Sequence, residues 1–379
     1  MLFDYETLKL IWWAFIGILF IGFAITDGMD MGVGNLLPII GRTDMQRRIM
    51  INTVGPHWDG NQVWFITAGG AIFAAWPMVY AAAFSGFYFA MLLVLFALFF
   101  RPVAFDYRGK LPSNRWRSGW DWGLFIGSFV PPLVFGIAFG NLLLGVPFHL
   151  DEFMRPFYTG HFWELFHPFA LLCGLVGVAM ITLHGAIWLQ LRTSGDLAAN
   201  AARWAGYSAI GTFVLFGLAG LWLALGIDGY RITQMPPAGD ILSPLMKQAE
   251  QVPGAWLDNY RKLPLTLIFP LMGLGGALLT WWLSRRNNPG LGFLASSLTM
   301  AGIIMTAGIS LFPFIMPSSS RPEASLTIWD ATSSPTTLNV MFWAVVIFLP
   351  IIITYTSWNY YKMRGKVTEE EIQGRFSAY

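Results

Sequence analysis

The stretch that decides the fold is residues 8–38, which read LKLIWWAFIGILFIGFAITDGMDMGVGNLLP. Between residues 10 and 26 it contains no charged side chain. A helix needs about 20 predominantly apolar residues to cross the hydrocarbon core of a bilayer. The stretch therefore predicts a membrane-spanning helix, and the two carboxylates near its end, Asp27 and Asp30, need a separate explanation.

Further apolar runs of similar length follow along the rest of the chain. Apolar residues make up 55% of the 379 positions and charged residues 12%, about half the roughly 25% found in soluble domains. A soluble protein could not cover so much apolar surface with so few charges. We expect an all-α polytopic membrane protein with about nine spans, near residues 8–38, 49–75, 78–100, 120–145, 165–191, 204–227, 263–284, 290–313 and 338–361.

Other classes of protein fit the composition poorly. The single cysteine, Cys173, excludes a disulfide scaffold. A net charge of +2 gives no reason to expect a nucleic-acid partner. The first six residues, MLFDYE, are acidic where a signal peptide is basic, so the first apolar run is interpreted as a span.

The predicted connections are too short to form a separate soluble domain. The longest, about 228–262 and 314–337, fall on the same predicted side of the membrane. We expect a single transmembrane domain over residues 1–367 and a polar cytoplasmic tail over 368–379. Nine spans would suit two four-helix bundles and one peripheral helix.

The distribution of basic residues predicts the orientation. With nine spans and the N-terminus outside, 16 of the 23 Lys and Arg residues fall in inner segments and 7 in outer ones. Without the doubtful second span, the split would weaken to 14 against 9. Because inner loops are enriched in Lys and Arg, we expect a periplasmic N-terminus and a cytoplasmic C-terminus.

Carboxylates inside a span need a reason, because each costs about 2.5–3.5 kcal/mol on insertion scales. Asp27 and Asp30 are three residues apart and share one face of the first span. Either they satisfy other polar groups between helices, or they belong to a proton or ion route, and the sequence leaves both readings open.

The second span carries the densest run of polar residues, PHWDGNQ at 56–62. His57 and Asn61 would share one helix face, and Asp59 and Gln62 another. We expect Asp59 to lie near the middle of its span without a basic partner, which favours a proton relay. His57 belongs to the same run, whose hydrogen-bonding side chains suit a water-filled path.

The histidines do not predict a haem or metal site. His149 and His161 fall in a predicted outer loop and His167 at the outer edge of the fifth span. Only His57 and His184 lie deeper in predicted spans, and their depths differ. No Cys/His metal spacing, phosphate-binding loop or nucleophile motif occurs. We therefore predict no metal site and no catalytic residue in this chain.

Several long motifs stand out along the chain: TDGMDMGVG (26–34), RRIMIN (47–52), PHWDGNQVW (56–64), FSGFY (84–88), FRPVAFDYR (100–108), GSFVPP (127–132), FPFIMPSS (312–319) and WDATSS (329–334). Together they resemble subunit II of the bacterial cytochrome bd-type quinol oxidases, and the similarity covers essentially the whole chain.

The resemblance implies a role in a terminal respiratory oxidase of the bacterial inner membrane, which oxidises a quinol and reduces dioxygen to water. Haem b and haem d would lie in the partner subunit I, and this chain alone would be inactive. Expected partners are subunit I, small single-helix accessory subunits, quinol and lipids. A structural quinone in this subunit is also implied, at residues that the resemblance does not identify.

The resemblance also assigns two positions. The one matching Asp59 lies at the interface with subunit I, on a proton route from the cytoplasm, and the one matching Trp64 lies near the mouth of an oxygen path. The composition alone would suit a secondary transporter equally well, and a stand-alone haem protein far less. The motifs favour the oxidase subunit.

Two glycine pairs have the spacing that lets helices approach closely, Gly28 with Gly32 and Gly136 with Gly140. The main interpretation is packing between helices of this chain. If subunit I holds the cofactors, an apolar face must also meet it, and the Gly28/Gly32 face and the second span are the candidates.

Overall fold

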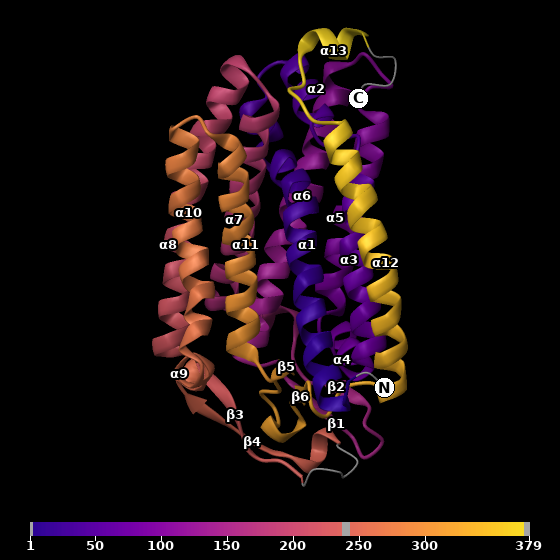
Figure 1. Ribbon diagram of the computed structural model, residues 1–379, viewed down its shortest axis with the longest axis vertical. Coiled ribbons are helices and arrows are strands. Elements are labelled where there is room, and N and C mark those ends of the chain that lie inside the picture. The colour runs from indigo at the N-terminus through magenta and orange to yellow at the C-terminus, as the bar shows by residue number, and fades with distance from the viewer. Residues whose placement is uncertain (1–2, 237–242, 375–379) are drawn as a thin grey trace.

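The computed structural model describes residues 3–236 and 243–374 as a bundle of long helices that run side by side (Figure 1). One end of the bundle carries short strands, and we call it the strand end. The opposite end carries α2 (Asp44–Asn52), and we call it the α2 end. Helix α1 begins at the strand end and α12 ends at the α2 end, as an odd number of crossings requires (Figure 1).

In residues 3–236 and 243–374, nine helices run between the two ends. Within the described residues, eight helices are long and apolar enough to cross a membrane, or up to nine if one bent pair counts as a span. The predicted all-α polytopic class with about nine spans is confirmed. The crossing helices are α1 (Tyr5–Ile40), α3 (Trp58–Ala75), α5 (Tyr88–Tyr107), α6 (Asn114–Leu144), α7 (Pro168–Arg192), α8 (Gly195–Gly226), α10 (Ile268–Arg285), α11 (Pro289–Leu311) and α12 (Pro335–Lys362).

The bent pair joins α3 to α4 (Pro77–Gly86), with an angle of 118° between them. The 18 residues of α3 reach about 27 Å, close to the thickness of the hydrocarbon core. Pro77 starts α4, since proline fits a first helical turn and ends the helix before it. The predicted spans 49–75 and 78–100 therefore have the wrong boundaries: residues 53–57 form a turn before α3, and α4 is separate from α5.

The helices form two groups with one peripheral helix, as predicted (Figure 1). Helices α7, α8, α10 and α11 pack together, and α1, α3, α5 and α6 form the other group. In the second group, α1 and α6 face the first group: α1 packs on α7 and α11, and α6 packs on α7. Helix α12 lies outside and buries only Leu338 and Phe342.

The glycine pairs allow the closest approaches inside the bundle. A Cβ atom on Gly32 would lie 2.2 Å from the carbonyl oxygen of Ile181 in α7, and one on Gly136 would lie 2.3 Å from that of Cys173. Both pairs therefore serve packing within this chain. The expectation that the Gly28/Gly32 face also meets a partner is wrong, because α7 already occupies that face.

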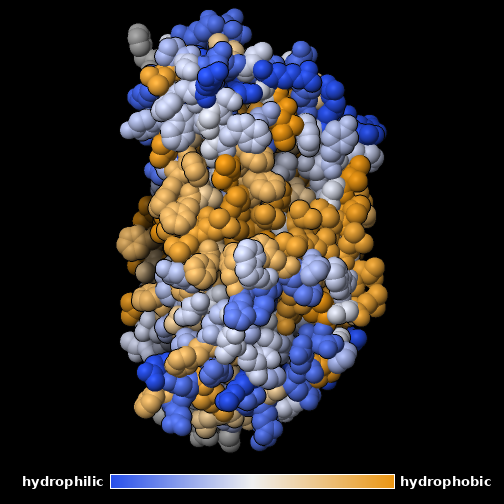
Figure 2. All heavy atoms as spheres, turned by 180° about the vertical axis from the view of Figure 1, so that it is seen from behind, coloured by the Kyte–Doolittle hydropathy of each residue, from blue (hydrophilic) through white to orange (hydrophobic). Residues whose placement is uncertain are grey.

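The surface has the polarity of a membrane protein. An apolar band crosses the middle of the molecule, and hydrophilic residues gather at both ends (Figure 2). Tryptophan and charged residues at span ends complete this pattern, as in Trp282 and Arg286, whose guanidinium lies 5.1 Å from the indole ring.

Three antiparallel two-stranded hairpins form the strand end in the described residues. They pair β1 (Phe148–Leu150) with β2 (Pro156–Tyr158), β3 (Asp228–Gln234) with β4 (Gln248–Pro253), and β5 (Phe314–Met316) with β6 (Leu326–Thr327). Short helices link them, namely η1 (Phe162–Phe166), η2 (Pro244–Met246), η3 (Ala255–Leu257), α9 (Asp258–Lys262), η4 (Pro264–Leu267) and η5 (Pro322–Ala324).

A buried ion pair joins the two long connections there. Lys247 Nζ lies 3.0 Å from Asp330 Oδ2 and donates to the carbonyl oxygens of Pro244 and Glu323 at 2.9 and 3.0 Å. Burial lowers the pKa of Lys247, and the neighbouring Asp330 opposes that shift. The pair fixes the β3–β4 hairpin to the 314–337 connection.

Buried and partly exposed ion pairs hold the α2 end together. Asp121 of α6 accepts from Arg47 at 2.7 Å and from Arg108 at 2.6 Å. Asp44 accepts from Arg108 at 2.9 Å and from Arg117 at 2.8 Å. The network ties α2 to the end of α5 and the start of α6.

The segment after α12 folds back onto this end. The backbone N–H of Val367 donates to the carbonyl of Arg192 at 2.8 Å. Part of the predicted polar tail, Glu369–Gly374, forms α13, which contacts α2 and buries Ile372. Residues 375–379 of that tail lie outside the described residues.

Candidate functional site

The intramembrane aspartates lie in one polar cluster that several helices build. Asp27 of α1 accepts two hydrogen bonds from Arg101 of α5, Nη1 to Oδ2 at 2.8 Å and Nη2 to Oδ1 at 2.5 Å. Both side chains are at most 1% exposed. Gly127 of α6 leaves the room for the arginine, since a Cβ there would lie 2.8 Å from Arg101 Cγ. Asp27 therefore has a buried cationic partner, which the sequence analysis did not find.

Asp30 lies one turn further along α1 and faces α3. Its Oδ2 accepts from Asn61 Nδ2 at 2.7 Å. Its Oδ1 is 3.9 Å from His57 Nδ1 and, within residues 3–236 and 243–374, accepts no hydrogen bond. Asn61 Nδ2 also lies 3.4 Å from His57 Nδ1. The expected shared face of His57 and Asn61 is present, and it meets Asp30.

Peripheral helix α12 completes the cluster. Tyr360 Oη donates to Asn61 Oδ1 at 2.6 Å. The tyrosine ring lies 4.8 Å from the ring of His57 and 6.4 Å from that of Trp188 in α7, measured between centroids. Sequence reasoning missed this contact because the two residues are 299 positions apart.

Around the start of α3, buried residues alternate with exposed ones. The turn at 53–57 puts the first helical residue at Trp58, so His57 and Asn61 point inward while Asp59 and Gly60 are exposed. Asp59 thus lies in the first turn of its helix, not near the middle of a span, because the predicted span began nine residues too early. A carboxylate is favourable there, since the N-terminal end of a helix carries partial positive charge.

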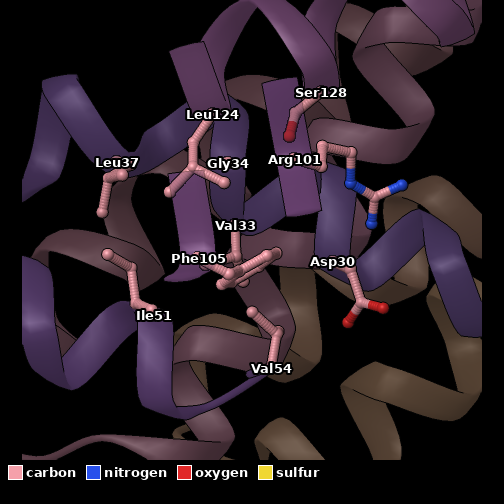
Figure 3. Close-up of a pocket in the computed structure, with 10 residues that line it drawn as sticks. All are labelled: Asp30, Val33, Gly34, Leu37, Ile51, Val54, Arg101, Phe105, Leu124 and Ser128. Carbon is pink, nitrogen blue, oxygen red and sulfur yellow. The ribbon is translucent and has the colours of Figure 1, made fainter. Parts of the chain in front are cut away.

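A small cavity lies beside the aspartates. Its volume is about 10 Å³, enough for one water at most. Figure 3 shows the side chains of Asp30 and Arg101 on one side of it and those of Leu37 and Ile51 on the other. Ser128 of α6 also lines it. The polar cluster therefore borders an apolar core.

Trp64 lies one turn beyond Asn61 on α3, outside the cluster. Its ring packs flat against Gly22 of α1, where an added Cβ would lie 2.7 Å from the indole Cε3. The ring thus fills the contact between α1 and α3 and is partly exposed.

The histidines of this chain do not fit a haem. His184 uses both ring nitrogens, Nδ1 with Ser296 Oγ at 2.7 Å and Nε2 with the carbonyl of Ile25 at 3.0 Å. His57 faces Asn61 and Asp30 instead of a second histidine. In the described part of the chain, no three His, Cys, Asp or Glu side chains converge as metal ligands. We derive no step through a haem or a metal in this chain.

Comparisons with known proteins agree with these features. The sequence model of the family described as cytochrome bd terminal oxidase subunit II matches residues 8–363. The chain is 56% identical over 370 residues to the cytochrome bd-I ubiquinol oxidase subunit 2 of Escherichia coli K12, covering 98% of each. It is 33% identical over 364 residues to the cytochrome bd ubiquinol oxidase subunit 2 of Bacillus subtilis, covering 95% of this chain and 97% of the relative.

A solved structure supports the fold independently of close sequence similarity. A chain in the structure of bd oxidase from Geobacillus thermodenitrificans superposes with a TM-score of 0.66 at 16% identity, covering 93% of this chain and 97% of that one. At this identity the likeness concerns the fold alone. Together with the family match over residues 8–363, these findings show that the chain belongs to the subunit II family of the cytochrome bd terminal oxidases.

Proposed function

We propose that this chain supports the haem-bearing subunit I of a bacterial quinol oxidase and provides protons and oxygen to the site of dioxygen reduction. Its relatives are subunits of cytochrome bd ubiquinol oxidase, a quinol:oxygen oxidoreductase. The overall reaction converts two quinols and one dioxygen into two quinones and two waters. Each dioxygen therefore needs four electrons and four protons, and the protons must reach a site inside the membrane.

The polar cluster is the observation that carries the proton role. It lies in the half of the bundle nearer the α2 end, which the basic residues assign to the cytoplasm. Asp30 Oδ1 accepts no hydrogen bond among the described residues, so it is the atom we propose takes up the proton. His57 Nδ1, 3.9 Å away, is the neighbouring group that exchanges it. Asp27, paired with Arg101, lies beside them.

Asp59 would deliver the proton to the partner. It lies within one turn of His57 and Asn61 but on the exposed face of α3. A route through the first turn of α3 would therefore lead from the buried cluster to the surface of this chain, where subunit I would receive the proton.

The same face of α3 is the surface we propose for subunit I. Val63, Ile66 and Phe73 are 46, 70 and 60% exposed, although they are apolar. Nothing lies within 4 Å of a Cβ added at Gly60 or Gly70. Small residues on an apolar face allow a second helix to approach closely.

The proposal also includes the oxygen path, the haems, the small accessory subunits, the lipids and the quinone. Trp64, between α1 and α3, lies near the mouth of the oxygen path, which must be apolar. Haem b and haem d belong to subunit I, and small single-helix subunits and lipids cover the remaining apolar surface, including the middle of α12. Ligand pockets usually span about 300–1,000 Å³, so the cavity beside Asp30, about 10 Å³, is too small to hold a quinone.

The protein lies in the bacterial inner membrane as a multi-span subunit. We propose the orientation that the basic residues predict, with the α2 end and the C-terminus in the cytoplasm and the N-terminus in the periplasm.

Substitution of Asp59 by Asn in the assembled oxidase tests the relay. Asn keeps the shape and most hydrogen bonds but cannot exchange a proton in the neutral range. We expect normal haem content and a strong loss of quinol oxidase turnover per haem d. Asp196→Asn is the control, since Asp196 is also exposed in the first turn of a helix at the α2 end. Unchanged turnover per haem d in Asp59→Asn would end the relay proposal.

A further inference from the structure

We propose that Tyr360 is a positioning residue, which holds the side-chain amide of Asn61 with its Nδ2 toward Asp30. The inference rests on the proposed proton role of Asp30 for its functional meaning. Its structural part does not depend on that role. In it, a residue of the peripheral helix α12 sets the hydrogen bonding of an aspartate on α1.

The side-chain amide of Asn61 is hydrogen-bonded at both ends. Nδ2 donates to Asp30 Oδ2 at 2.7 Å and to the carbonyl oxygen of Thr26 at 3.3 Å, and Oδ1 accepts from Tyr360 Oη at 2.6 Å. An ionised carboxylate only accepts hydrogen bonds, so the amide must present its nitrogen to Asp30. The tyrosine hydroxyl can donate to the remaining amide oxygen. The amide is therefore held from both sides in one of its two orientations.

Without the hydroxyl, Asn61 Oδ1 loses its donor and the preference for this orientation weakens. A rotation of the amide by half a turn would place Oδ1 against Asp30 and the carbonyl oxygen of Thr26, where only a protonated carboxyl of Asp30 could donate to it. Donation from Tyr360 also polarises the amide and strengthens its bond to the carboxylate, as in other hydrogen-bonded chains. Tyr360 thus favours the ionised form of Asp30 through Asn61 without touching Asp30.

Tyr360 is held by packing, although most side chains of α12 are exposed. The helix is buried at Leu338 and Phe342 near its start, while Ile351, Tyr355 and Trp358 are 59, 59 and 61% exposed. At its last turn, the tyrosine ring packs on His57. The return of the chain to α7 and α2 immediately after α12 holds this turn in place.

Several charged and titratable groups face the cluster from the surrounding elements. Asp27 lies on α1 beside Asp30, Arg101 reaches it from α5, and His57 precedes α3. Arg192 of α7 acts electrostatically on His57. None of these groups contacts the Tyr360 hydroxyl in the described hydrogen bonds, whose acceptor is Asn61. Removing that hydroxyl therefore leaves every charge in place.

The test compares Tyr360→Phe with Tyr361→Phe in the purified, assembled oxidase. Tyr361 is the matched control, because it is the neighbouring residue, is 54% exposed and stacks on Arg364 instead of entering the cluster. The readout is the infrared band of the protonated Asp30 carboxyl as a function of pH, assigned by its absence in Asp30→Asn. We expect its midpoint to move upward by about 0.5–1 pH unit in Tyr360→Phe, the size of one neutral hydrogen bond, and to stay in place in Tyr361→Phe.

A double variant tests whether Asn61 transmits the effect. In an Asn61→Ala background, Tyr360→Phe should cause no further movement of the band. An unchanged band in Tyr360→Phe, or the same movement with and without Asn61, would overturn the inference. Loss of haem d in Tyr360→Phe alone would assign Tyr360 to assembly and would overturn it as well.

The same samples separate this inference from the proton role. If the band moves but turnover keeps its pH profile, Asp30 is not on the proton route and Tyr360 still positions Asn61. If both move together, the two proposals are supported. Normal turnover in Asp30→Asn would remove the proton role of Asp30 without affecting the infrared result.

Discussion

Asp27 and Arg101 form a two-point ion pair inside the bundle, with Nη1–Oδ2 and Nη2–Oδ1 distances of 2.8 and 2.5 Å. The paired planar geometry satisfies both carboxylate oxygens at once, which is the strongest arrangement for such groups. It also joins the central helix α1 to α5, two helices that are far apart in the sequence.

Removing one partner of this pair should destabilise the subunit strongly. Arg101→Leu would leave Asp27 buried without a cation, which costs about 3–5 kcal/mol. Arg117→Leu is the control, because the Arg117–Asp44 pair is exposed by 30 and 37% and should contribute less than about 1 kcal/mol. Thermal unfolding of the purified complex measures both. Equal losses of stability would show that burial does not strengthen the role of Asp27–Arg101.

Gly32→Ala should disturb the contact between α1 and α7. The added methyl would lie 2.2 Å from a backbone carbonyl oxygen, which cannot move aside as a side chain can. We expect a loss of about 1–3 kcal/mol or more, seen as a lower melting temperature and yield. Gly275→Ala on α10 has nothing within 4 Å of the new methyl and should be neutral or slightly stabilising. Similar behaviour of the two variants would contradict the packing described here.

Gly70→Leu should weaken assembly without harming the fold of this subunit. Its surroundings within the chain are open, but the proposed contact with subunit I would be blocked. We expect less subunit I and less haem d per copy of this chain after purification through a tag on it. Gly275→Leu has equally open surroundings on α10 and should assemble normally. Normal haem content in both would place subunit I on another face.

A topology reporter should find residue 45 in the cytoplasm and residue 320 in the periplasm. The first follows α1 at the α2 end, and the second lies in the connection between β5 and β6 at the strand end. Enzyme fusions active on only one side of the membrane measure this directly. A periplasmic signal at residue 45 would reverse the proposed orientation and the direction of the proton route.

The sequence was most informative about structural features that depend on a single helix. Helical spacing correctly put His57 and Asn61 on one shared face, and apolar runs indicated the class and approximate number of spans. It could not give neighbours across helices, because depth and rotation are set by packing. Arg101 lies 74 positions from Asp27, and Tyr360 lies 299 from Asn61. The position of Asp59 was wrong for a local reason, since hydropathy did not show that the turn at 53–57 delays the start of α3.

The sequence therefore identified the unusual residues but not the residues that contact them. The aspartates were visible because charges in apolar runs are rare. Their partners were hidden because Arg101 falls near the end of a predicted span, where a basic residue is ordinary, and Tyr360 falls among other aromatic residues at the end of the last one.

The pairing of Asp27 with Arg101 also bears on how the chain is made. Helix α1 leaves the ribosome first, yet the arginine that neutralises its carboxylate is synthesised 74 residues later. Until α5 follows, the carboxyl of Asp27 lacks its cation, and a carboxylate in the hydrocarbon core costs about 2.5–3.5 kcal/mol. The insertion of α1 therefore becomes fully favourable only when α5 packs against it, and the order of translation becomes part of the folding route.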